Sequence, residues 1–524
     1  MMSAKERAPF GRLAVLGLQH VLVMYTGCVT VPLVFGAAAG LDASTIALLI
    51  NADLLVAGVV TMIQGAGVGR VLGVRMPVMA GAAFTAVTPM ILIAGEYGLQ
   101  AVYGSMLAAG IFGLLVAWPF AKAARFFPPL VSGVVITVVG LALIGVGVNL
   151  VVGSDPKAAD YAAPSRLALA AFVVIVILLV ARFGRSFLAQ TGVLLGLLAG
   201  TAVAVPLGLV DLSAARGADW IGASAPFHFG APEFPPVAVI SMCVVMLVLF
   251  AESTADLIAV AELTGKELTT ADMARGLAAD GLSGVLGGVM NAFIDTVFAQ
   301  NVGLVSMTRV RSRHVVTVAG AILVALGLVP KLGAVVAGLP GPVVGAAGLV
   351  MFATVAAVGI STLRKVEFEG THNLLIVAVS IGVGMAPDVA PDLYSRFPDG
   401  VRIVLGSPVT SATLIAFGLN LAFNRTRPAR TADDEAEAEA EKQTRPTSTT
   451  PAEYVPIAGL PGRPRTSSAG ARVGGVLVVG AGCVLDREDT DAVAECTPAV
   501  RDATRVDEAV ARAQAFETQA GRSL

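Results

Sequence analysis

The stretch LAVLGLQHVLVMYTGCVTVPLVFGAAAGL, residues 13–41, contains no Asp, Glu, Lys or Arg. A helix needs about 20 mostly apolar residues to cross a bilayer, so this stretch predicts a membrane-spanning segment. Residues 126–154, 186–210 and 234–251 also lack these charges. Only 14% of the 524 residues are charged, whereas an ordinary soluble domain carries about 25%. The composition excludes a soluble globule and predicts an all-α polytopic membrane protein.

The same rule, applied along the whole chain, predicts fourteen crossings with boundaries loose by a few residues. We expect them near 13–36, 45–67, 76–94, 100–120, 129–150, 166–182, 190–210, 237–261, 275–290, 296–308, 316–332, 343–363, 372–386 and 404–423. The first apolar run follows Lys5, Arg7 and Arg12 in the manner of a signal peptide. It is too long for one and has no convincing small-residue cleavage site, so we expect it to be retained as a crossing.

The distribution of Lys and Arg predicts the orientation. With a cytoplasmic N-terminus, eighteen of these residues fall at inside ends and six at outside ends. Cytoplasmic loops carry an excess of Lys and Arg, and one missed or invented crossing would exchange the sides of every later loop. We therefore expect a multi-pass protein of the cell membrane with both termini in the cytoplasm.

The chain is expected to have three parts. Residues 1–12 form a cytoplasmic N-terminus and residues 13–424 a transmembrane domain. From residue 425 to 524 the composition changes to Asp, Glu, Arg, Thr, Ser, Pro and Ala, with an acidic run at 433–441. Such a composition is typical of a solvated, disordered or weakly folded tail, and a small regulatory or partner-binding element is the alternative.

Fourteen crossings divide into two sevens, residues 13–210 and 237–423. Because seven is odd, a duplication of this kind is an inverted repeat. The third crossing of each half is irregular: the first contains Pro77, Gly81 and Pro89, and the second has only thirteen residues between Asp295 and Arg309. Interrupted segments at corresponding positions indicate a substrate site near the bilayer midplane. The alternative is that one of them merely lines a loop or re-entrant turn.

Acidic residues inside the crossings indicate where such a site lies. Glu252 is close to the middle of the eighth crossing, where a carboxyl group costs about 2.5 kcal/mol or more unless it is paired, solvated or protonated. We expect it to face a cavity. Asp256 lies one turn further on the same helix face, and Asp280 is in the ninth crossing, as a functional group or as a helix-end group. Asp295 is expected at the outer boundary, in contact with solvent.

The sequence lacks the residue patterns of several other functions. The charges nearly balance, with 35 Lys and Arg against 37 Asp and Glu, and the four cysteines have no metal-ligand spacing. Nucleic-acid binding, a metal site and a disulfide framework are therefore not expected. The sequence contains no Walker motif or nucleophile triad, so we expect neither an enzyme nor a cofactor. His20 is the only histidine inside a crossing, and we expect a packed hydrogen-bonding residue, with a proton carrier as the alternative.

Several short motifs follow one another along the chain. They are residues 18–22 (LQHVL), Met76-Pro77, residues 81–84 (GAAF), residues 252–254 (EST) followed by Asp256, residues 279–282 (ADGL), and residues 298–303 (FAQNVG) followed by Thr308-Arg309. Together they resemble the nucleobase:cation symporters of the xanthine/uracil permease type, also called nucleobase-ascorbate transporters. The resemblance covers about residues 10–423. It implies seven-plus-seven inverted repeats forming a core and a gate domain, with a short strand in the third and tenth segments.

The resemblance also implies roles for single residues. Glu252 would accept or share hydrogens with ring N–H groups, and Gln300 would pair with another edge of the base. Backbone groups of Phe84 and Ala299 would bind the ligand, and the rings of Phe84 and Phe298 would pack on it.

Further residues would support transport without binding the base. Asp280 and Asp256 would belong to the proton-coupling group, Asn301 would orient the tenth segment, and His20 stays secondary. Gln at residue 300 resembles purine carriers, whereas Glu there resembles uracil carriers. Ile294-Asp295 departs from the family, whose members commonly have Pro and a polar or aromatic residue at these positions.

We therefore expect import of a purine nucleobase, xanthine or uric acid, by proton symport with an elevator-like movement, and sodium as the alternative coupling ion. A uracil or pyrimidine permease, an anion carrier or channel of the same fold, and a receptor or scaffold using the tail are the alternatives. An anion carrier is expected to place a positive group at the midplane, whereas the central charges here are acidic. The expected partners are the nucleobase, the proton, the lipid bilayer and a second copy of the chain in a homodimer, but no nucleic acid.

Overall fold

The computed structural model describes residues 10–424, apart from 124–128, 154–155, 159, 185–186, 309 and 369–370, and the short segments 454–456, 469–473, 476–478 and 484–485. The chain divides into two compact units, Met1–Thr426 and Arg427–Leu524. The first unit contains, in order, α1 (Phe10–Ala38), α2 (Ala43–Ala66), β1 (Ala80–Ala82), the 3₁₀ helix η1 (Phe84–Ala86), α3 (Val87–Tyr97), α4 (Leu99–Ala123), α5 (Pro129–Val152), α6 (Pro164–Phe183), α7 (Phe187–Gln190), α8 (Gly192–Ala204), α9 (Ser213–Gly217), α10 (Pro236–Thr264), α11 (Thr270–Met290), β2 (Asp295–Val297), α12 (Ala299–Thr308), α13 (Arg313–Gly327), α14 (Pro330–Ala337), α15 (Gly341–Leu363), α16 (Asn373–Val389), α17 (Asp399–Gly406) and α18 (Pro408–Asn424).

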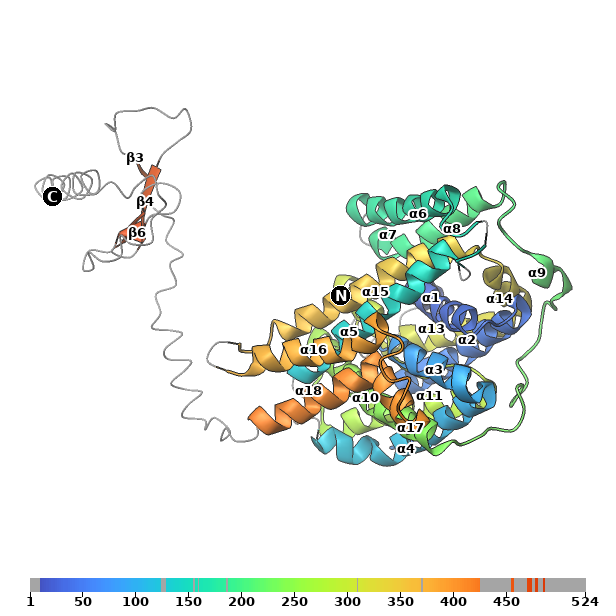
Figure 1. The fold of residues 1–524 in the computed structure, drawn as a ribbon, viewed down its shortest axis with the longest axis horizontal. Helices are drawn as coiled ribbons and strands as arrows, with labels where there is room; N and C mark the ends of the chain where they lie inside the picture. The colour runs from blue at the N-terminus through green and yellow to red at the C-terminus, as the bar shows by residue number, and fades with distance from the viewer. Residues whose placement is uncertain are drawn as a thin grey trace, which may run out of the picture. The chain divides into compact units, whose positions relative to one another are not determined.

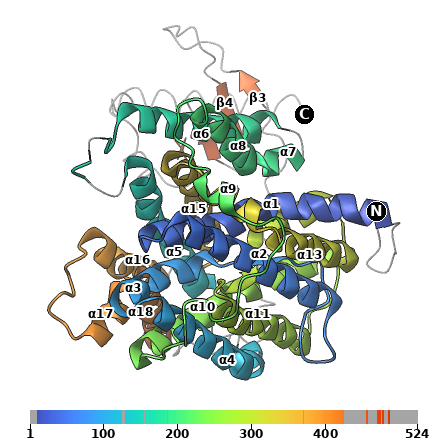
Figure 2. The ribbon, with the colours of Figure 1, turned by 90° about the vertical axis from the view of Figure 1, so that its right-hand side faces the viewer.

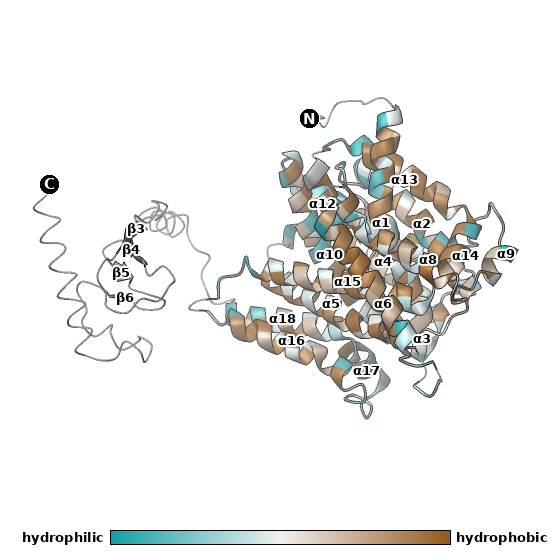
Figure 3. Ribbon diagram, turned by 90° about the horizontal axis from the view of Figure 1, so that it is seen from above, coloured by the Kyte–Doolittle hydropathy of each residue, from teal (hydrophilic) through white to brown (hydrophobic). Residues whose placement is uncertain are grey.

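The predicted crossings correspond to these elements. Seven described helices are long and apolar enough to cross a membrane alone, and α13 with α14, bent by 78°, would make an eighth. The remaining six predicted crossings are α11, which carries three charged residues, and five short or interrupted segments: β1 with η1 and α3, α7 with α8, β2 with α12, α16, and α17 with α18. Figure 3 shows hydrophobic residues along most of these helices. The all-helical membrane class, with short strands in the third and tenth segments, is confirmed.

The helix contacts repeat between the two halves. Helix α2 packs on α13 while α11 packs on α4, and α1 packs on α13 while α10 packs on α4. In the same way α6 packs on α8 and α16 packs on α18. Exchanging each element of the first seven segments with its counterpart in the second seven turns one set of contacts into the other. This is the pattern that a twofold repeat produces.

The helices form two groups. One group is built around α1, α2, α4, α10, α11 and α13, together with the two strands, and we call it the core. The other contains α5, α6, α8, α15, α16 and α18, and we call it the gate. Figure 1 shows α5 and α15 lying along one another, in agreement with their contacts, and Figure 2 shows α6 and α8 close together away from α4 and α11. Helices α10, α17 and α18 meet where the groups adjoin.

Small residues allow the core helices to approach closely. A Cβ atom at Gly110 of α4 would lie 2.3 Å from the backbone nitrogen of Val285 and 2.8 Å from the carbonyl oxygen of Gly281, both on α11. Membrane helices commonly use small residues in this way because close backbones gain van der Waals contact. The abundance of glycine in the sequence, 58 residues, is partly explained by such contacts.

Replacement of Gly110 by Val is expected to destabilise the core, because a side chain there must push the backbones of α4 and α11 apart. Overpacking of this kind costs about 1–3 kcal/mol, occasionally more. The melting temperature of the purified protein measures it. Gly418→Val in α18 is the matched control, since a Cβ there meets nothing within 4 Å. Equal melting temperatures for the two variants would contradict the packing described.

Local sequence signals fix the helix starts. The Asp42 side chain caps α2 by accepting hydrogen bonds from the backbone N–H groups of Ser44 and Thr45. Hydrogen bonds from Ser44 and Thr45 lower the pKa of the Asp42 carboxyl to about 2. At α11, Thr269 and Asp272 form a capping box. In this motif each side chain accepts a hydrogen bond from the backbone N–H of the other residue. Both starts were within a few residues of the predicted crossings.

The second unit contains four short strands. Strands β3 (Tyr454–Pro456), β4 (Ala469–Val473), β5 (Val476–Val478) and β6 (Val484–Leu485) pair in that order as an antiparallel sheet. Four segments of this unit, made mostly of apolar or small residues, thus form one sheet. The expectation of a disordered or weakly folded tail falls mainly on residues outside the described ones. The same is true of the expected cytoplasmic N-terminus, of which only residues 10–12 are described.

Candidate functional site

The two interrupted segments meet as a pair of short strands. Strands β1 and β2 are antiparallel, with Ala80 opposite Val297 and Ala82 opposite Asp295. The pairing continues on both sides, because the Phe298 N–H donates to the Met79 carbonyl and the Ala83 N–H donates to the Ile294 carbonyl, both at 2.9 Å. Segments about 215 residues apart are thus joined in the middle of the core.

Each strand is held by a hydroxyl group from a neighbouring helix. Thr61 Oγ1 of α2 accepts from the Ala80 N–H at 3.0 Å and donates to the Ala80 carbonyl at 3.2 Å. Ser283 Oγ of α11 accepts from the Asp295 N–H at 2.8 Å and donates to the Asp295 carbonyl at 2.7 Å. The two halves of the repeat therefore use the same contact. It satisfies backbone groups that hydrocarbon cannot.

Glu252 lies where the core faces the gate. Its carboxylate accepts a hydrogen bond from Thr85 Oγ1 of η1 at 3.0 Å. The side chain borders a narrow gap whose other walls are α5 and α18, with Ser132 and Thr413 among the lining residues. The residue is half-buried. The structure thus places this intramembrane acid at the boundary between the two groups of helices, beside a gap of about 10 Å³. Its expected contact with a substrate cavity stays a prediction.

Two helix N-termini adjoin this position. Helix α12 starts directly after β2, and η1 with α3 starts directly after β1; because the strands are antiparallel, the two helices leave in opposite directions. Helix α10, which carries Glu252, contacts both η1 and α12. Helix N-termini carry partial positive charge and stabilise anionic groups in interrupted membrane helices. They therefore lower the cost of placing a carboxylate here.

Ala299 and Gln300 form the first turn of α12, and both are half-buried. Within the part of the chain that the structure describes, the Gln300 amide has no hydrogen-bond partner. A carboxamide offers one acceptor and two donors. Gln300 is therefore free to bind a ligand with a mixed edge of donors and acceptors.

The two predicted aromatic residues are both buried. The Phe84 ring meets the Phe352 ring of α15 edge to face, with centroids 5.6 Å apart. The Phe298 ring fills a notch formed by Gly27 of α1 and Gly81, where a Cβ at Gly27 would lie 2.1 Å from the ring. Phe84 thus links the strand pair to the gate, whereas Phe298 links it to α1. Their stacking on a ligand stays a prediction.

Asn301 and His20 bind one another. Asn301 Nδ2 lies 3.1 Å from His20 Nδ1 and donates to the His20 carbonyl at 3.1 Å, and both residues are 2% exposed. With Nδ1 as acceptor, a neutral His20 carries its hydrogen on Nε2. This arrangement agrees with a packed hydrogen-bonding histidine. It also ties α12 to α1, and the orienting role expected of Asn301 stays a prediction.

Asp280 is fully buried in the middle of α11. Its Oδ1 accepts from Gln64 Nε2 of α2 at 3.1 Å, and Gln64 also donates to the Gly276 carbonyl at 3.0 Å. The Ser253 hydroxyl of α10 lies beside Asp280 and accepts from the Val297 N–H at 3.4 Å. Asp280 therefore joins α2, α10 and β2 behind the strands. It is not a helix-end group.

Asp256 follows Glu252 by one turn and is half-buried. One of its carboxylate oxygens is buried without a hydrogen-bond partner among the described residues. It interacts electrostatically with Glu252 and Asp280. The structure brings the three predicted acids into one region, with no cation in contact with them among the described ion pairs.

The expectation for Asp295 was wrong. It was placed at the outer boundary in contact with solvent because a charge usually ends a crossing. Its side chain is fully buried and its backbone belongs to β2. The strand pairing holds this segment at the depth of the core, so the charge marks the interior of the segment rather than its end.

Three polar residues that hold the site were not singled out by the sequence reasoning. Thr61 and Gln64 lie in the second crossing, and so does Asp53, which is fully buried. An available signal was that Asp53 is the only charged residue in the stretch 43–69. The rule that selected Glu252 would also have selected it.

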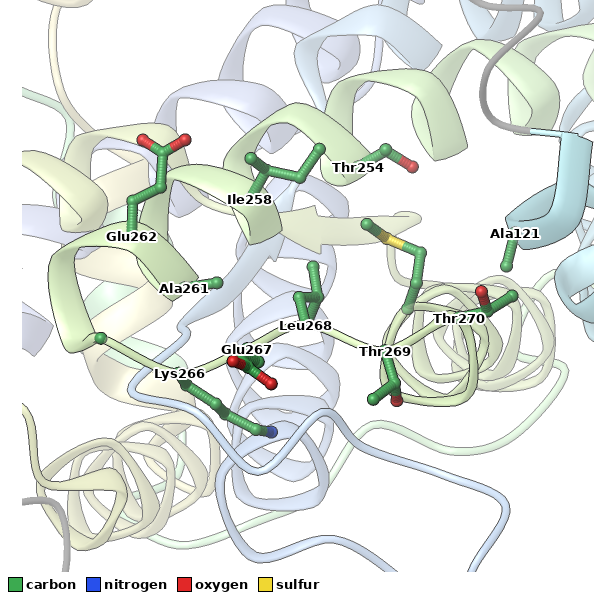
Figure 4. Close-up of a pocket in the computed structure, with 12 residues that line it drawn as sticks. Ala121, Thr254, Ile258, Ala261, Glu262, Lys266, Glu267, Leu268, Thr269 and Thr270 are labelled. Atoms are coloured by element: carbon green, nitrogen blue, oxygen red, sulfur yellow. The ribbon is translucent and has the colours of Figure 1, made fainter. Parts of the chain in front are cut away.

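A larger pocket than the gap beside Glu252 lies elsewhere in the described part of the chain. About 530 Å³ lies between the C-terminal end of α10, residues 265–269, the start of α11 and Ala121 of α4. Figure 4 shows Ala121 and Thr254 toward one end of it and Lys266 and Glu262 toward the other. At about 100° per residue, Thr254 and Ile258 lie roughly opposite Glu252 on the helix. The cavity is therefore separate from the site described above.

Sequence comparisons identify the relatives of this chain. The model of a permease family matches residues 11–393. The chain is 42% identical over 417 residues to the uric acid transporter UacT of Escherichia coli (strain K12), covering 79% of this chain and 86% of that protein. It is 39% identical over 436 residues to the xanthine permease of Bacillus subtilis (strain 168), covering 83% of this chain and 99% of that protein.

Solved structures with little sequence similarity share the fold. The transmembrane domain of a cyanobacterium bicarbonate transporter BicA matches with a TM-score of 0.51 at 14% identity, over 78% of this chain and 98% of that one. The murine Solute Carrier 26 family member A9 anion transporter, in an inward-facing state, matches with a TM-score of 0.54 at 14% identity, over 81% of this chain and 70% of that one. The seven-plus-seven repeat with core and gate is confirmed, and the chain belongs to the xanthine/uracil permease family of membrane transporters.

Proposed function

We propose that the protein imports a purine nucleobase, xanthine or uric acid, by proton symport. The observation that carries this proposal is the placement of a half-buried carboxylate, Glu252, at the boundary between core and gate, with the unpartnered amide of Gln300 on the contacting helix α12. The relatives named as uric acid transporter and xanthine permease support the substrate class.

The chemistry of the two side chains suits a flat heterocycle. Xanthine and uric acid present ring N–H groups and carbonyl oxygens around a planar ring. The Glu252 carboxylate is an acceptor for N–H groups, whereas the Gln300 amide can donate to a carbonyl and accept from an N–H. Backbone groups at the starts of η1 and α12 would complete the edge contacts.

The acids supply the coupling. A proton on the group of Glu252, Asp256 and Asp280 reduces the cost of buried negative charge and lets the base bind. Proton and base then favour one another's binding, which is a reciprocal free energy. The loaded core moves against the gate and releases both on the cytoplasmic side, where the distribution of Lys and Arg predicts the two termini.

Uptake by cells that lack their own nucleobase carriers tests the proposal. Labelled xanthine, uric acid and uracil are offered across a range of external pH, with and without a protonophore and with and without sodium. Purine uptake that rises at acidic external pH and is lost with the protonophore supports it. Preference for uracil, dependence on sodium, or transport of inorganic anions instead would each contradict it.

Replacement of Gln300 by Glu is expected to shift selectivity away from xanthine, since a carboxylate cannot donate to the base. A mismatch at one buried edge costs about 1–3 kcal/mol, which is roughly 5- to 150-fold in affinity. Competition of unlabelled xanthine and uracil against labelled substrate measures the shift. Gln100→Glu, at an exposed position near the start of α4, is the control. Unchanged selectivity in Gln300→Glu would exclude this edge from recognition.

A further inference from the structure

Two acidic side chains that the proposed transport mechanism does not use lie inside the core. Asp53 of α2 and Asp295 of β2 are both 0% exposed. All four of their carboxyl oxygens are buried without a hydrogen-bond partner among the described residues. Buried polar groups are almost always satisfied, so such a concentration of unpartnered atoms requires an explanation.

The two carboxyl groups lie in one region of the core. Strand β2, which carries Asp295, contacts α2, which carries Asp53. Cys28 of α1 interacts electrostatically with both acids, and Asp53 acts on Asp295. The Cys28 thiol of α1 and the Phe293 N–H lie beside Asp53, but neither completes a hydrogen bond of normal geometry. The neighbouring groups therefore leave the carboxyl oxygens of Asp53 and Asp295 without a hydrogen bond.

Among the described residues, no positive charge forms an ion pair with either acid. The titratable groups around it are Cys28 of α1, Tyr103 of α4 and Asp280 of α11. None is a cation, and none of the ion pairs found in the described part of the chain includes Asp53 or Asp295. The Tyr103 hydroxyl is itself buried without a partner and lies within electrostatic reach of Asp53. It is a second, independent polar group left unsatisfied next to the same acid.

Two adjacent ionised carboxylates cannot persist there. Burial removes the solvation of each charge, and two like charges that share a site raise the cost further. One proton removes one charge and turns the pair into an acid that donates to a carboxylate, a strong type of hydrogen bond. The described residues contain no group of three or more His, Cys, Asp and Glu residues that would hold a metal ion.

We propose that Asp53 and Asp295 share one proton, and that this proton fixes strand β2 against α2 without being transported. Both side chains are sealed from solvent, whereas Glu252 borders the gap between core and gate. Asp295 is two residues before Val297, whose N–H contacts Ser253 beside Asp280. The shared proton therefore positions the strand from which α12 and Gln300 start. This assignment does not depend on the substrate or on the coupling ion.

The variant Asp295→Asn distinguishes the effect of the shared proton from the effect of the hydrogen bond. An amide beside the Asp53 carboxylate has the same net charge as an acid–carboxylate pair and also donates a hydrogen bond, but needs no proton. Asp295→Ala removes the donor and leaves Asp53 alone. Asp53→Asn makes the same change as Asp295→Asn from the other side, and Asp392→Asn, in an exposed loop, is the control.

Infrared spectroscopy and thermal unfolding of the full-length purified protein test the proposal. At neutral pH the wild type should show a protonated-carboxyl band that Asp295→Asn and Asp53→Asn both lose and Asp392→Asn keeps. The melting temperature of the wild type should fall at alkaline pH, where the shared proton is removed. That of Asp295→Asn should stay level over the same range, and that of Asp295→Ala should be lowered at every pH.

Three results would overturn the proposal. The first is an unchanged band in Asp295→Asn, which would show that the pair is ionised in the wild type. The second is a melting temperature of Asp295→Asn as low as that of Asp295→Ala. The third is stabilisation of the wild type, but not of Asp295→Asn, by sodium, which would assign the compensating cation to sodium. All three readouts are independent of uptake, so they separate this proposal from the transport function.

Discussion

Glu252→Gln is expected to abolish coupled uptake while the protein still folds and inserts. The amide keeps an oxygen that accepts from Thr85 Oγ1, so the contact between α10 and η1 survives. It can neither carry negative charge nor exchange a proton. Loss of a hydrogen bond to a charged group costs about 1.5–3 kcal/mol, or roughly 10- to 100-fold in affinity, and the loss of coupling adds to it.

Uptake of labelled purine, normalised to the amount of protein in the membrane, measures this effect. Glu262→Gln is the matched control, since Glu262 is an exposed residue on the same helix. The variant should also bind substrate without the pH dependence of the wild type. Wild-type uptake rates in Glu252→Gln would remove this carboxylate from the mechanism.

The hydroxyl contacts of Thr61 and Ser283 are expected to be equally necessary in the two halves. Ser283→Ala leaves the backbone N–H and carbonyl of Asp295 without their partner, and Thr61→Val does the same to Ala80. Each buried backbone group left unsatisfied costs about 1–3 kcal/mol, so each variant loses about 2–6 kcal/mol. Uptake should fall with stability, because the strands position Thr85 and Gln300.

Thermal unfolding and uptake of the purified and reconstituted variants measure this loss. Thr61→Ser retains the hydroxyl and should restore most of the function. Ser105→Ala is the control, because the buried Ser105 hydroxyl bonds only the Val102 carbonyl of its own helix. If Ser283→Ala is no less stable than Ser105→Ala, the hydrogen bonds of Ser283 to the Asp295 backbone contribute nothing to stability.

Much of the fold was predictable because the bilayer imposes simple lengths. Uncharged runs such as 13–41 identify crossings, and the Pro and Gly residues of segment 76–94 identify an interruption. The odd number of crossings in each half then requires an inverted repeat. The short strands followed from the family resemblance rather than from propensity, since three residues such as Ala80–Ala82 carry no strand signal of their own.

The site was predictable only in part. Glu252 and Asp280 are conspicuous as acids inside apolar crossings, and their burial agrees with that signal. Asp295 was misplaced because a charge was taken as the end of a segment, whereas long-range pairing with β1 sets its depth. The contact of Gln64 with Asp280 joins residues 216 positions apart. Sequence periodicity contains no information on contacts between residues so far apart in the sequence.

The central claim is that a purine binds between Glu252 of α10 and Gln300 of α12, beside the strand pair. The most direct test is an experimental structure of the protein with xanthine or uric acid bound. The account predicts flat ligand density with one edge at the Glu252 carboxylate and another at the Gln300 amide. Density only in the cavity beside Lys266 and Thr269, with Glu252 packed against dry helix surface, would contradict it.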